Sequence, residues 1–367
     1  MKILFFTPTA GQSGSEQLLL RMIEGLDLNE IECGIYIENG NQNPDIKGVK
    51  TFCNPFNTKK GLSKLLLKCK NFLFGDSFEK EILKIHKKFK PDFWYLNTVL
   101  MAPMASIASK HNIKFVSHLH ERPHIIFELV KAKHLENFLL KSELSIGNAQ
   151  NTCKILEQLG SKNIAKIYPF LENNLLNPNP QTSNKLRKAL KIDSETYIWV
   201  ISGALTFAKG VDFLPKLALQ FPYIAFVWIG GNTDSGSYYF TQKICENLKN
   251  VYLVGPQNKE YLDYFGIGNG LLVLSLEESF GLVMLEALRF NMPIITFETG
   301  AVHEILTPKI GKIIPNWDYN SLCLAIEEVS SQGFTFDRDE AKRQLNKFDK
   351  AIEIGNWKKL LKNVNEN

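Results

Sequence analysis

The chain has 367 residues, more than one hydrophobic core usually supports, so its length indicates two domains. Its 44% hydrophobic and 22% charged residues exclude a disordered, collagen-like or repetitive chain, and its net charge of +5 is modest. The cysteines form no CxxC pair, which excludes the usual zinc and disulfide patterns, and the N-terminal apolar run is too short for a signal peptide.

The first half of the sequence alternates between strand-like and helix-like segments. "KILFFTPT" predicts a strand, and "AGQSGSEQLLLRMIEGL" after it predicts a loop and a helix. Further strands are expected at "IECGIYIE", "DFWYLN", "KFVSHLH" and "LSIGNA". Strands that alternate with helices indicate a parallel sheet with both faces covered.

A basic segment interrupts this half. Residues 47–90 contain twelve lysines and only three acidic residues. Within "KKGLSKLLLKCKNFLF", residues 59–74, leucines recur at helical intervals while Lys60, Lys64 and Lys68 share another face. The pattern fits a helix that lies on an anionic membrane, and equally a sheet-covering helix with a solvated lysine face. Nucleic-acid binding is not predicted, because no motif interleaves aromatic and basic residues.

A Pro- and Asn-rich stretch at residues 168–184 has the composition of a linker, and the alternation restarts after it. Strands are expected at "YIWVISGAL", "YIAFVWIGG", "NVYLVG", "GLLVLSL" and "MPIITF". We therefore expect two domains, residues 1–170 and 171–350, and a helix at 351–367 that could pack back on the first domain. Open parallel sheets bind ligands outside the carboxyl ends of their strands.

Two carboxylates flank a Phe-Gly pair in "LLVLSLEESFGLVMLEALRF", residues 271–290. Glu278 is expected in the loop after a strand, and Glu286 in the second turn of a helix that begins at Phe280. Gly281, in the first turn, would let an anion such as phosphate approach the backbone N–H groups. Paired hydroxyls of a sugar or ribose would satisfy Glu286. The alternative is that Glu286 pairs with Arg289 and that Glu278 only caps the helix.

Three further positions carry chemistry at strand ends. Gly203 follows a strand, and Lys209 shortly after it is placed to meet a phosphate, although most surface lysines are only solvated. His118 and His120 lie on one face of a strand, where they could donate to a sugar hydroxyl or phosphate or be purely structural. The loop with Gly14 lacks the three-glycine pattern of dinucleotide-binding proteins, which argues against a dehydrogenase.

Five runs together resemble the retaining family-4 glycosyltransferases of the two-domain GT-B fold: "SLEESFGLVMLEAL", "GALTFAKGVDF", "WIGGN", "TGAVHEIL" and "IGKIIPNWD". The most specific element is the E-x7-E pair of Glu278 and Glu286, with "FGLV" between them. "SGSE" and the "HE" of "HLHERP" resemble the matching N-terminal elements, so the likeness spans nearly the whole chain. It implies two Rossmann-like, doubly wound parallel-sheet domains that face a cleft, an N-terminal one for the acceptor and a C-terminal one for the donor.

The resemblance also implies roles for individual residues. Glu278 and His120 would be the catalytic residues, with His120 at the sugar or leaving group and Glu278 at the donor sugar. Glu286 would hold the nucleotide ribose and Lys209 the diphosphate. The remaining implied site residues are Gly203, Ser279, Phe280, Gly281 and Leu282 for the donor, and Gly14 and Ser15 beside the acceptor and diphosphate.

The family commonly has an arginine where this chain has Ala204, so the phosphate charge would fall to Lys209, the helix end and a further group. No Asp-x-Asp motif stands near the proposed site, and the resemblance implies neither metal nor cofactor.

The implied activity is transfer of a sugar from a UDP- or GDP-sugar to a glycan or lipid-linked acceptor, with retention of configuration, in cell-envelope polysaccharide or lipopolysaccharide synthesis. Two alternatives stay open: a catalytically silent relative that binds a glycan or a partner, and a nucleotide-sugar epimerase of the same fold. The expected location is the cytoplasm, with peripheral contact of residues 59–74 with the inner membrane face.

Overall fold

The computed structural model describes residues 1–10, 14–39, 44, 46–54, 77–122, 126, 128–172, 177–257 and 259–366. The basic segment at residues 59–74 lies outside this set, so its membrane contact stays a prediction. Among the described residues, no helix combines the length and the apolar composition that crossing a bilayer requires.

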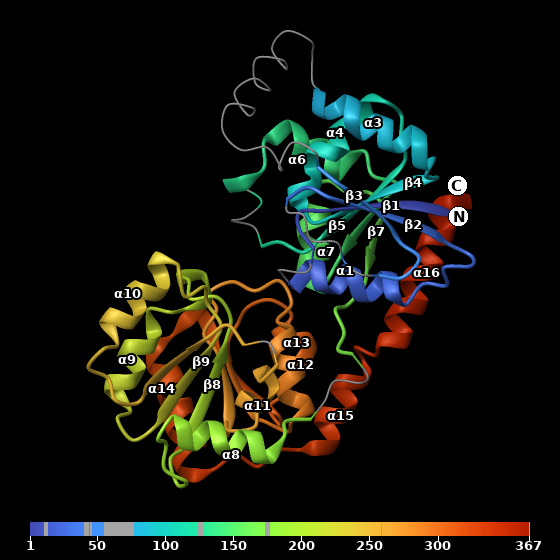
Figure 1. The fold of residues 1–367 in the computed structure, drawn as a ribbon. Coiled ribbons are helices and arrows are strands. Elements are labelled where there is room, and N and C mark those ends of the chain that lie inside the picture. The colour runs from blue at the N-terminus through green and yellow to red at the C-terminus, as the bar shows by residue number, and fades with distance from the viewer. Residues whose placement is uncertain are drawn as a thin grey trace. The chain divides into compact units, whose positions relative to one another are not determined.

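The chain folds into two compact units (Figure 1). The first comprises Met1–Pro169 together with Ala351–Asn367, and the second comprises Phe170–Lys350. The chain thus leaves the first unit, builds the second, and returns to the first with the helix at its C-terminal end. The acceptor and donor roles expected for the two halves stay predictions.

The first unit is built, in its described part, on a seven-stranded parallel sheet with the order β3-β2-β1-β4-β5-β6-β7. The strands are β1 (Lys2–Thr7), β2 (Glu32–Ile37), β3 (Lys50–Cys53), β4 (Phe93–Asn97), β5 (Phe115–Leu119), β6 (Leu144–Gly147) and β7 (Ile164–Lys166). In chain order, β2 and β3 are added on one side of β1, and β4 to β7 are added on its other side. The strand order thus reverses between β1 and β4, and the loops after these two strands run in opposite directions at the carboxyl edge of the sheet. Sheets of this type bind ligands at that point.

Helices cover both faces of this sheet. They are α1 (Gly14–Glu24), α3 (Ser77–Phe89), α4 (Ala102–Lys110), α6 (Ala132–Leu140), α7 (Gln150–Gln158) and α16 (Lys350–Glu366), with a 3-10 turn η1 (Val99–Met101). Buried residues of α3, α4 and α6 share one core cluster with Leu4, Phe6 and Trp94 of the strands. Neighbouring strand residues point to the opposite face, so the strands are apolar on both sides.

Helix α16 belongs to that opposite face, on the same side as α1 (Figure 1). Its Trp357 is fully buried, with ring centroids 6.0 Å from Phe5 and 5.6 Å from Tyr95. A side chain at Gly25, just after α1, would collide with Ile354 of α16, since an added Cβ would lie 2.2 Å from it. The helix at the C-terminal end is therefore part of the core of the first unit.

The second unit contains, among its described residues, a six-stranded parallel sheet with the order β10-β9-β8-β11-β12-β13. The strands are β8 (Ile198–Ser202), β9 (Ala225–Ile229), β10 (Val251–Gly255), β11 (Gly270–Val273), β12 (Ile294–Phe297) and β13 (Gly311–Ile314). In this sheet the strand order reverses between β8 and β11, because β9 and β10 lie on one side of β8 and β11 to β13 on the other. The loops after these two strands flank the ligand crevice that this topology produces.

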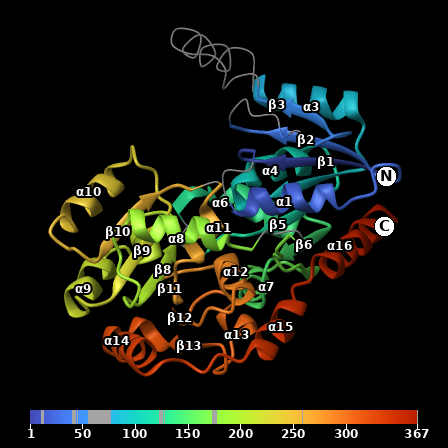
Figure 2. The same cartoon turned by 60° about the horizontal axis from the view of Figure 1, so that its bottom comes forward.

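The helices of the second unit again form two layers. They are α8 (Pro180–Ala189), α9 (Phe213–Gln220), α10 (Gly236–Ile244), α11 (Tyr261–Phe265), α12 (Leu282–Arg289), α13 (Val302–Ile305), α14 (Tyr319–Glu327) and α15 (Arg338–Asn346), with short turns η2 (Phe207–Lys209), η3 (Pro315–Trp317) and η4 (Glu328–Gln332). Helices α9 and α14 lie side by side (Figures 1 and 2) and share a core cluster with Trp199, Phe226 and Trp228.

The expected fold class, two open parallel sheets each covered by helices, is confirmed. Three short strands were not expected. β3 and β13 have four residues each and β7 has three. Each is an edge strand that pairs with a single neighbouring strand. Such short edge strands are only partly buried, so they lack the apolar run that marks a strand in a sequence.

Candidate functional site

The second unit gathers most of the predicted donor-site residues at its topological switch point. Gly203 directly follows β8, and Glu278 lies in the loop after β11, the neighbouring strand. The backbone N–H of Leu276 donates to the carbonyl of Ala208 at 3.0 Å, which ties the two loops together. Two loops that are far apart in sequence therefore act as one surface.

Lys209 and Glu278 form an ion pair at the centre of this surface, with Lys209 Nζ donating to Glu278 Oε1. Their side chains are 28% and 11% exposed, so the pair is partly shielded from water. The Ser275 hydroxyl donates to the same carboxylate oxygen at 2.9 Å, and the Glu278 backbone N–H donates to the Thr299 hydroxyl at 2.8 Å. Both the backbone and the carboxylate of Glu278 are thereby fixed.

Three glycines let the backbone approach closely around this pair. Gly300 has φ 61°, and a Cβ there would lie 2.7 Å from the Cβ of Glu278. Gly210 has φ 72°, and its Cβ would lie 2.0 Å from the Leu274 carbonyl oxygen. Gly203 has φ 148°, and its carbonyl accepts from Trp228 Nε1 at 3.0 Å. A larger residue at Gly300 or Gly210 would push the loop away from Glu278.

The helix after Glu278 begins later than the sequence indicated. Residues Phe280 and Gly281 were expected in its first turn, but α12 begins at Leu282, and Gly281 is its N-cap in the left-handed conformation with φ 94°. Glycine adopts this backbone without strain, which explains both the late start and the residue. Phe280 is buried, with its ring centroid 5.4 Å from that of Phe348, so only its backbone is available to a ligand.

Glu286 lies in the second turn of α12, as expected, and is only partly buried. The Tyr261 hydroxyl donates to its Oε2 at 2.8 Å, and Ser202 lies 3.0 Å from the same hydroxyl. Burial and the charge of Glu286 hold the pKa of Tyr261 well above its ordinary value. The Glu286 carboxylate is thus held by the neutral hydroxyl of Tyr261, next to Ser202 at the carboxyl end of β8.

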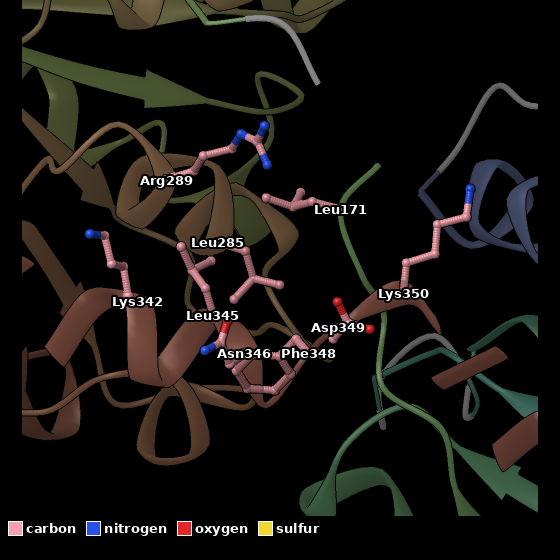
Figure 3. A pocket seen from close by; sticks show the side chains of 9 residues that line it. All are labelled: Leu171, Leu285, Arg289, Lys342, Leu345, Asn346, Phe348, Asp349 and Lys350. Carbon is pink, nitrogen blue, oxygen red and sulfur yellow. The ribbon is translucent and has the colours of Figure 1, made fainter. Parts of the chain in front are cut away.

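Helix α12 also lines a pocket of about 200 Å³ (Figure 3). Leu285 and Arg289 of the helix line it together with residues of α15 and the segment after it. The wall is completed by Leu171, Lys342, Leu345, Asn346, Phe348, Asp349 and Lys350. Lys350 is paired with Glu172 at 2.6 Å. The lining of this pocket does not include Lys209, Glu278 or Glu286.

In the first unit, the two histidines predicted from the sequence lie against each other. Their ring centroids are 3.8 Å apart, His118 Nδ1 lies 2.6 Å from the Tyr95 hydroxyl, and His120 Nε2 lies 2.9 Å from Asn97 Oδ1. Burial lowers the pKa of His120 to about 3 and that of His118 well below its ordinary value. Both rings are neutral at physiological pH.

Asn97 connects His120 with the loop after β1. Its Nδ2 donates to the Ser15 carbonyl at 3.3 Å, and since a carbonyl can only accept, Asn97 Oδ1 faces His120 and Nε2 carries the proton. Gly14 and Ser15 begin α1 beside this contact. The next residue after His120, Glu121, accepts from the backbone N–H groups of Val99 and His120, yet burial raises its pKa to about 7.

Comparison with known proteins agrees with this architecture. Residues 182–352 match the family model of glycosyl transferases group 1. A structure of Anabaena HepE in complex with UDP-glucose matches with TM-score 0.77 at 18% identity, covering 99% of this chain and 100% of that one. The sucrose-phosphate synthase of Thermosynechococcus elongatus matches with TM-score 0.79 at 16% identity, covering 99% of both. The chain has the GT-B fold.

A curated relative is alpha-galactosylglucosyldiacylglycerol synthase of Streptococcus pneumoniae (strain ATCC BAA-255 / R6), 30% identical over 140 residues. The alignment spans 36% of this chain and 37% of that protein, so the chain matches little more than a third of the length of this relative. Together with the family match, these likenesses support a glycosyltransferase of GT-B fold.

The structure also adds residues that the sequence did not point to. The predicted site residues are held by Tyr261, Ser202, Asn97 and Thr299. Of these only Thr299 stands in one of the runs that carry the resemblance, "TGAVHEIL". A signal exists for two of them: Asn97 and Ser202 end strands that flank the switch points. Among the described residues, no group of three or more His, Cys, Asp or Glu side chains is arranged to hold a metal ion.

Proposed function

We propose that the protein transfers a sugar from a nucleotide-sugar donor to a glycan or lipid-linked acceptor with retention of the anomeric configuration. The observation that carries the proposal is the arrangement at the switch point of the second unit. There Lys209, Glu278 and the start of α12 adjoin, and Glu286 follows one turn later. A cation and unpaired helix N–H groups suit a diphosphate, and a carboxylate nearby suits ribose hydroxyls.

In this proposal the donor site makes three kinds of contact. Lys209 and the backbone N–H groups near Gly281 bind the diphosphate, and Gly203 lets the phosphates approach the backbone. Glu286 accepts hydrogen bonds from the ribose, while Glu278, Ser279 and Leu282 face the donor sugar. Lys209 and the start of α12 then stabilise the negative charge that develops on the leaving diphosphate in the transition state. Because Ala204 carries no charge, Lys209 neutralises a larger share of the phosphate charge in this proposal.

The first unit supplies the remaining groups. His120, neutral and fixed as the Nε2–H tautomer by Asn97, contacts the donor sugar, where its unprotonated Nδ1 accepts from a sugar hydroxyl, and Gly14 and Ser15 border the acceptor and diphosphate. Retention is proposed from the family-4 resemblance of the E-x7-E pair. We expect no divalent cation to be required, because Lys209 and the start of α12 take the position of charge stabilisers.

The acceptor is proposed to be a glycan or lipid of the cell envelope. One relative is named as a glycolipid synthase, and the leucine- and lysine-rich sequence of residues 59–74 suits an anionic membrane surface. Flotation with anionic and neutral liposomes tests this part. Binding to anionic vesicles should fall when Lys60, Lys64 and Lys68 are replaced by glutamine, and equal flotation of both proteins would contradict it.

The decisive experiment is a panel of nucleoside diphosphates and nucleotide sugars, read first by thermal unfolding. A true donor stabilises the native state by mass action, by about 2.7 kcal/mol at 100 times its Kd. Release of nucleoside diphosphate then separates the alternatives. A silent binding protein is stabilised but releases none, and an epimerase converts the donor sugar without releasing the nucleotide. If no UDP- or GDP-sugar raises the melting temperature, the proposed function is wrong.

A further inference from the structure

Glu286 is held by a chain of hydrogen bonds from two other elements of the second unit. Ser202 is the last residue of β8, Tyr261 is the first residue of α11, and Glu286 is in the second turn of α12. The Ser202 hydroxyl lies 3.0 Å from the Tyr261 hydroxyl, which lies 2.8 Å from Glu286 Oε2. Three segments separated by more than twenty residues thus meet at one carboxylate.

The direction of this chain follows from the protons available. A carboxylate only accepts, so the single proton of the Tyr261 hydroxyl is directed to Glu286. The Tyr261 oxygen can then only accept from Ser202, and Ser202 is the donor of that pair. Because burial and the nearby carboxylate raise the pKa of Tyr261 well above its ordinary value, the hydroxyl keeps its proton at every pH the cell reaches.

We infer that Tyr261 is a positioning residue for nucleotide recognition, which holds the Glu286 carboxylate in the orientation that accepts the ribose hydroxyls. The inference rests on the proposed function and adds to it a residue that sets the preference for ribose over deoxyribose nucleotides. A carboxylate already oriented by a donor loses little rotational freedom when a ligand arrives, whereas an unsupported side chain must be ordered at that moment.

Ser202 connects this series of hydrogen bonds to the loop that carries Lys209. It immediately precedes Gly203, whose loop carries Lys209 six residues later. The hydrogen bond to Tyr261 therefore links the carboxylate assigned to ribose with the loop assigned to the diphosphate. The ribose and the diphosphate of one nucleotide would therefore be bound by residues that hydrogen bonds connect, and not by independent side chains.

The test measures binding, so it needs neither the acceptor nor the donor sugar. Titration calorimetry with UDP, GDP and ADP identifies the diphosphate that binds, and its 2′,3′-dideoxy analogue lacks both ribose hydroxyls. In the native protein the ribose form should bind about 10- to 100-fold tighter, the value of hydrogen bonds to a charged group. In Tyr261→Phe, affinity for the ribose form should fall roughly 2- to 10-fold, the effect of losing one hydrogen bond that orients the carboxylate. The dideoxy form should be almost unaffected.

Two further variants make the result specific. Tyr264→Phe removes a hydroxyl from the same helix and should leave the ratio of ribose to dideoxy affinity unchanged. Ser202→Ala leaves Tyr261 in place and should reduce the ratio by a smaller factor than Tyr261→Phe. If Tyr261→Phe leaves the ratio of ribose to dideoxy affinity unchanged, whether both affinities fall equally or neither falls, the inference is overturned while the proposed function stays intact. Failure of every diphosphate to bind the native protein would overturn the proposed function itself.

Discussion

Replacing Glu278 by glutamine should strengthen the binding of a free nucleoside diphosphate while abolishing sugar transfer. Lys209 is paired with Glu278, and the proposed diphosphate must compete for the same ammonium group. Glutamine keeps the size and hydrogen-bonding capacity of the side chain but removes its charge. The variant therefore releases Lys209 without opening a cavity, and it also removes an anion from the neighbourhood of the phosphates.

The size of the effect follows from the exposure of the pair. Two unit charges 4 Å apart attract by about 4 kcal/mol at an effective dielectric constant of 20. Partial exposure, 28% for Lys209 and 11% for Glu278, and the desolvation of both groups reduce the net value to about 1 kcal/mol. Because 1.4 kcal/mol corresponds to a factor of ten, UDP or GDP should bind about 5-fold tighter to the variant.

The assay is titration calorimetry of the diphosphate that stabilises the native protein, combined with a transfer or donor-hydrolysis assay. Glu277→Gln is the matched control, since it makes the same change in net charge one residue away from the pair. The control should bind the diphosphate nearly as the native protein does. Weaker or unchanged binding to Glu278→Gln, or an equal gain in both variants, would refute the competition between Glu278 and phosphate for Lys209.

Three other predictions follow from the same site. Gly300→Ala should lower activity and cost about 1–2 kcal/mol of unfolding free energy, because its Cβ would press on Glu278 from a left-handed backbone; Gly333→Ala, with φ 81° and open space around it, should show the backbone cost alone. Burial lowers the pKa of His118, so the unfolded state binds the extra proton and stability falls as the pH drops below about 6.5. His118→Gln should flatten this slope by up to about 1.4 kcal/mol per pH unit in urea unfolding, whereas parallel slopes would contradict the buried neutral ring. EDTA should leave transfer unchanged, and restoration of lost activity by Mg²⁺ or Mn²⁺ would show that a metal is required.

The parts of the molecule that were predictable from the sequence are those whose signal is local. Buried strands such as "FWYLN" and "IWVIS" are continuous apolar runs, and the alternation of strands with helices specifies a parallel sheet. The same alternation places Lys209 and Glu278 after strands. The topology that makes β8 and β11 neighbours then brings these two residues into contact.

What could not be predicted depends on pairings between distant residues. Lys209 and Glu278 are 69 positions apart, and nothing near either residue indicates that they form an ion pair. Tyr261 stands in an ordinary amphipathic stretch, and only the fold places its hydroxyl beside Glu286. The late start of α12 likewise depends on the left-handed backbone at Gly281, which a periodic pattern of apolar residues does not reveal.

The return of α16 to the first unit has a consequence for how the protein is made. Trp357 fills the space beside Phe5 and Tyr95, but it leaves the ribosome only after the whole of Phe170–Lys350 has been synthesised. Phe5 and Tyr95 must therefore stay uncovered by Trp357 on the nascent chain while the second unit is already able to fold. Premature termination anywhere before Trp357 would yield a product with a defective core, which cellular proteases readily remove.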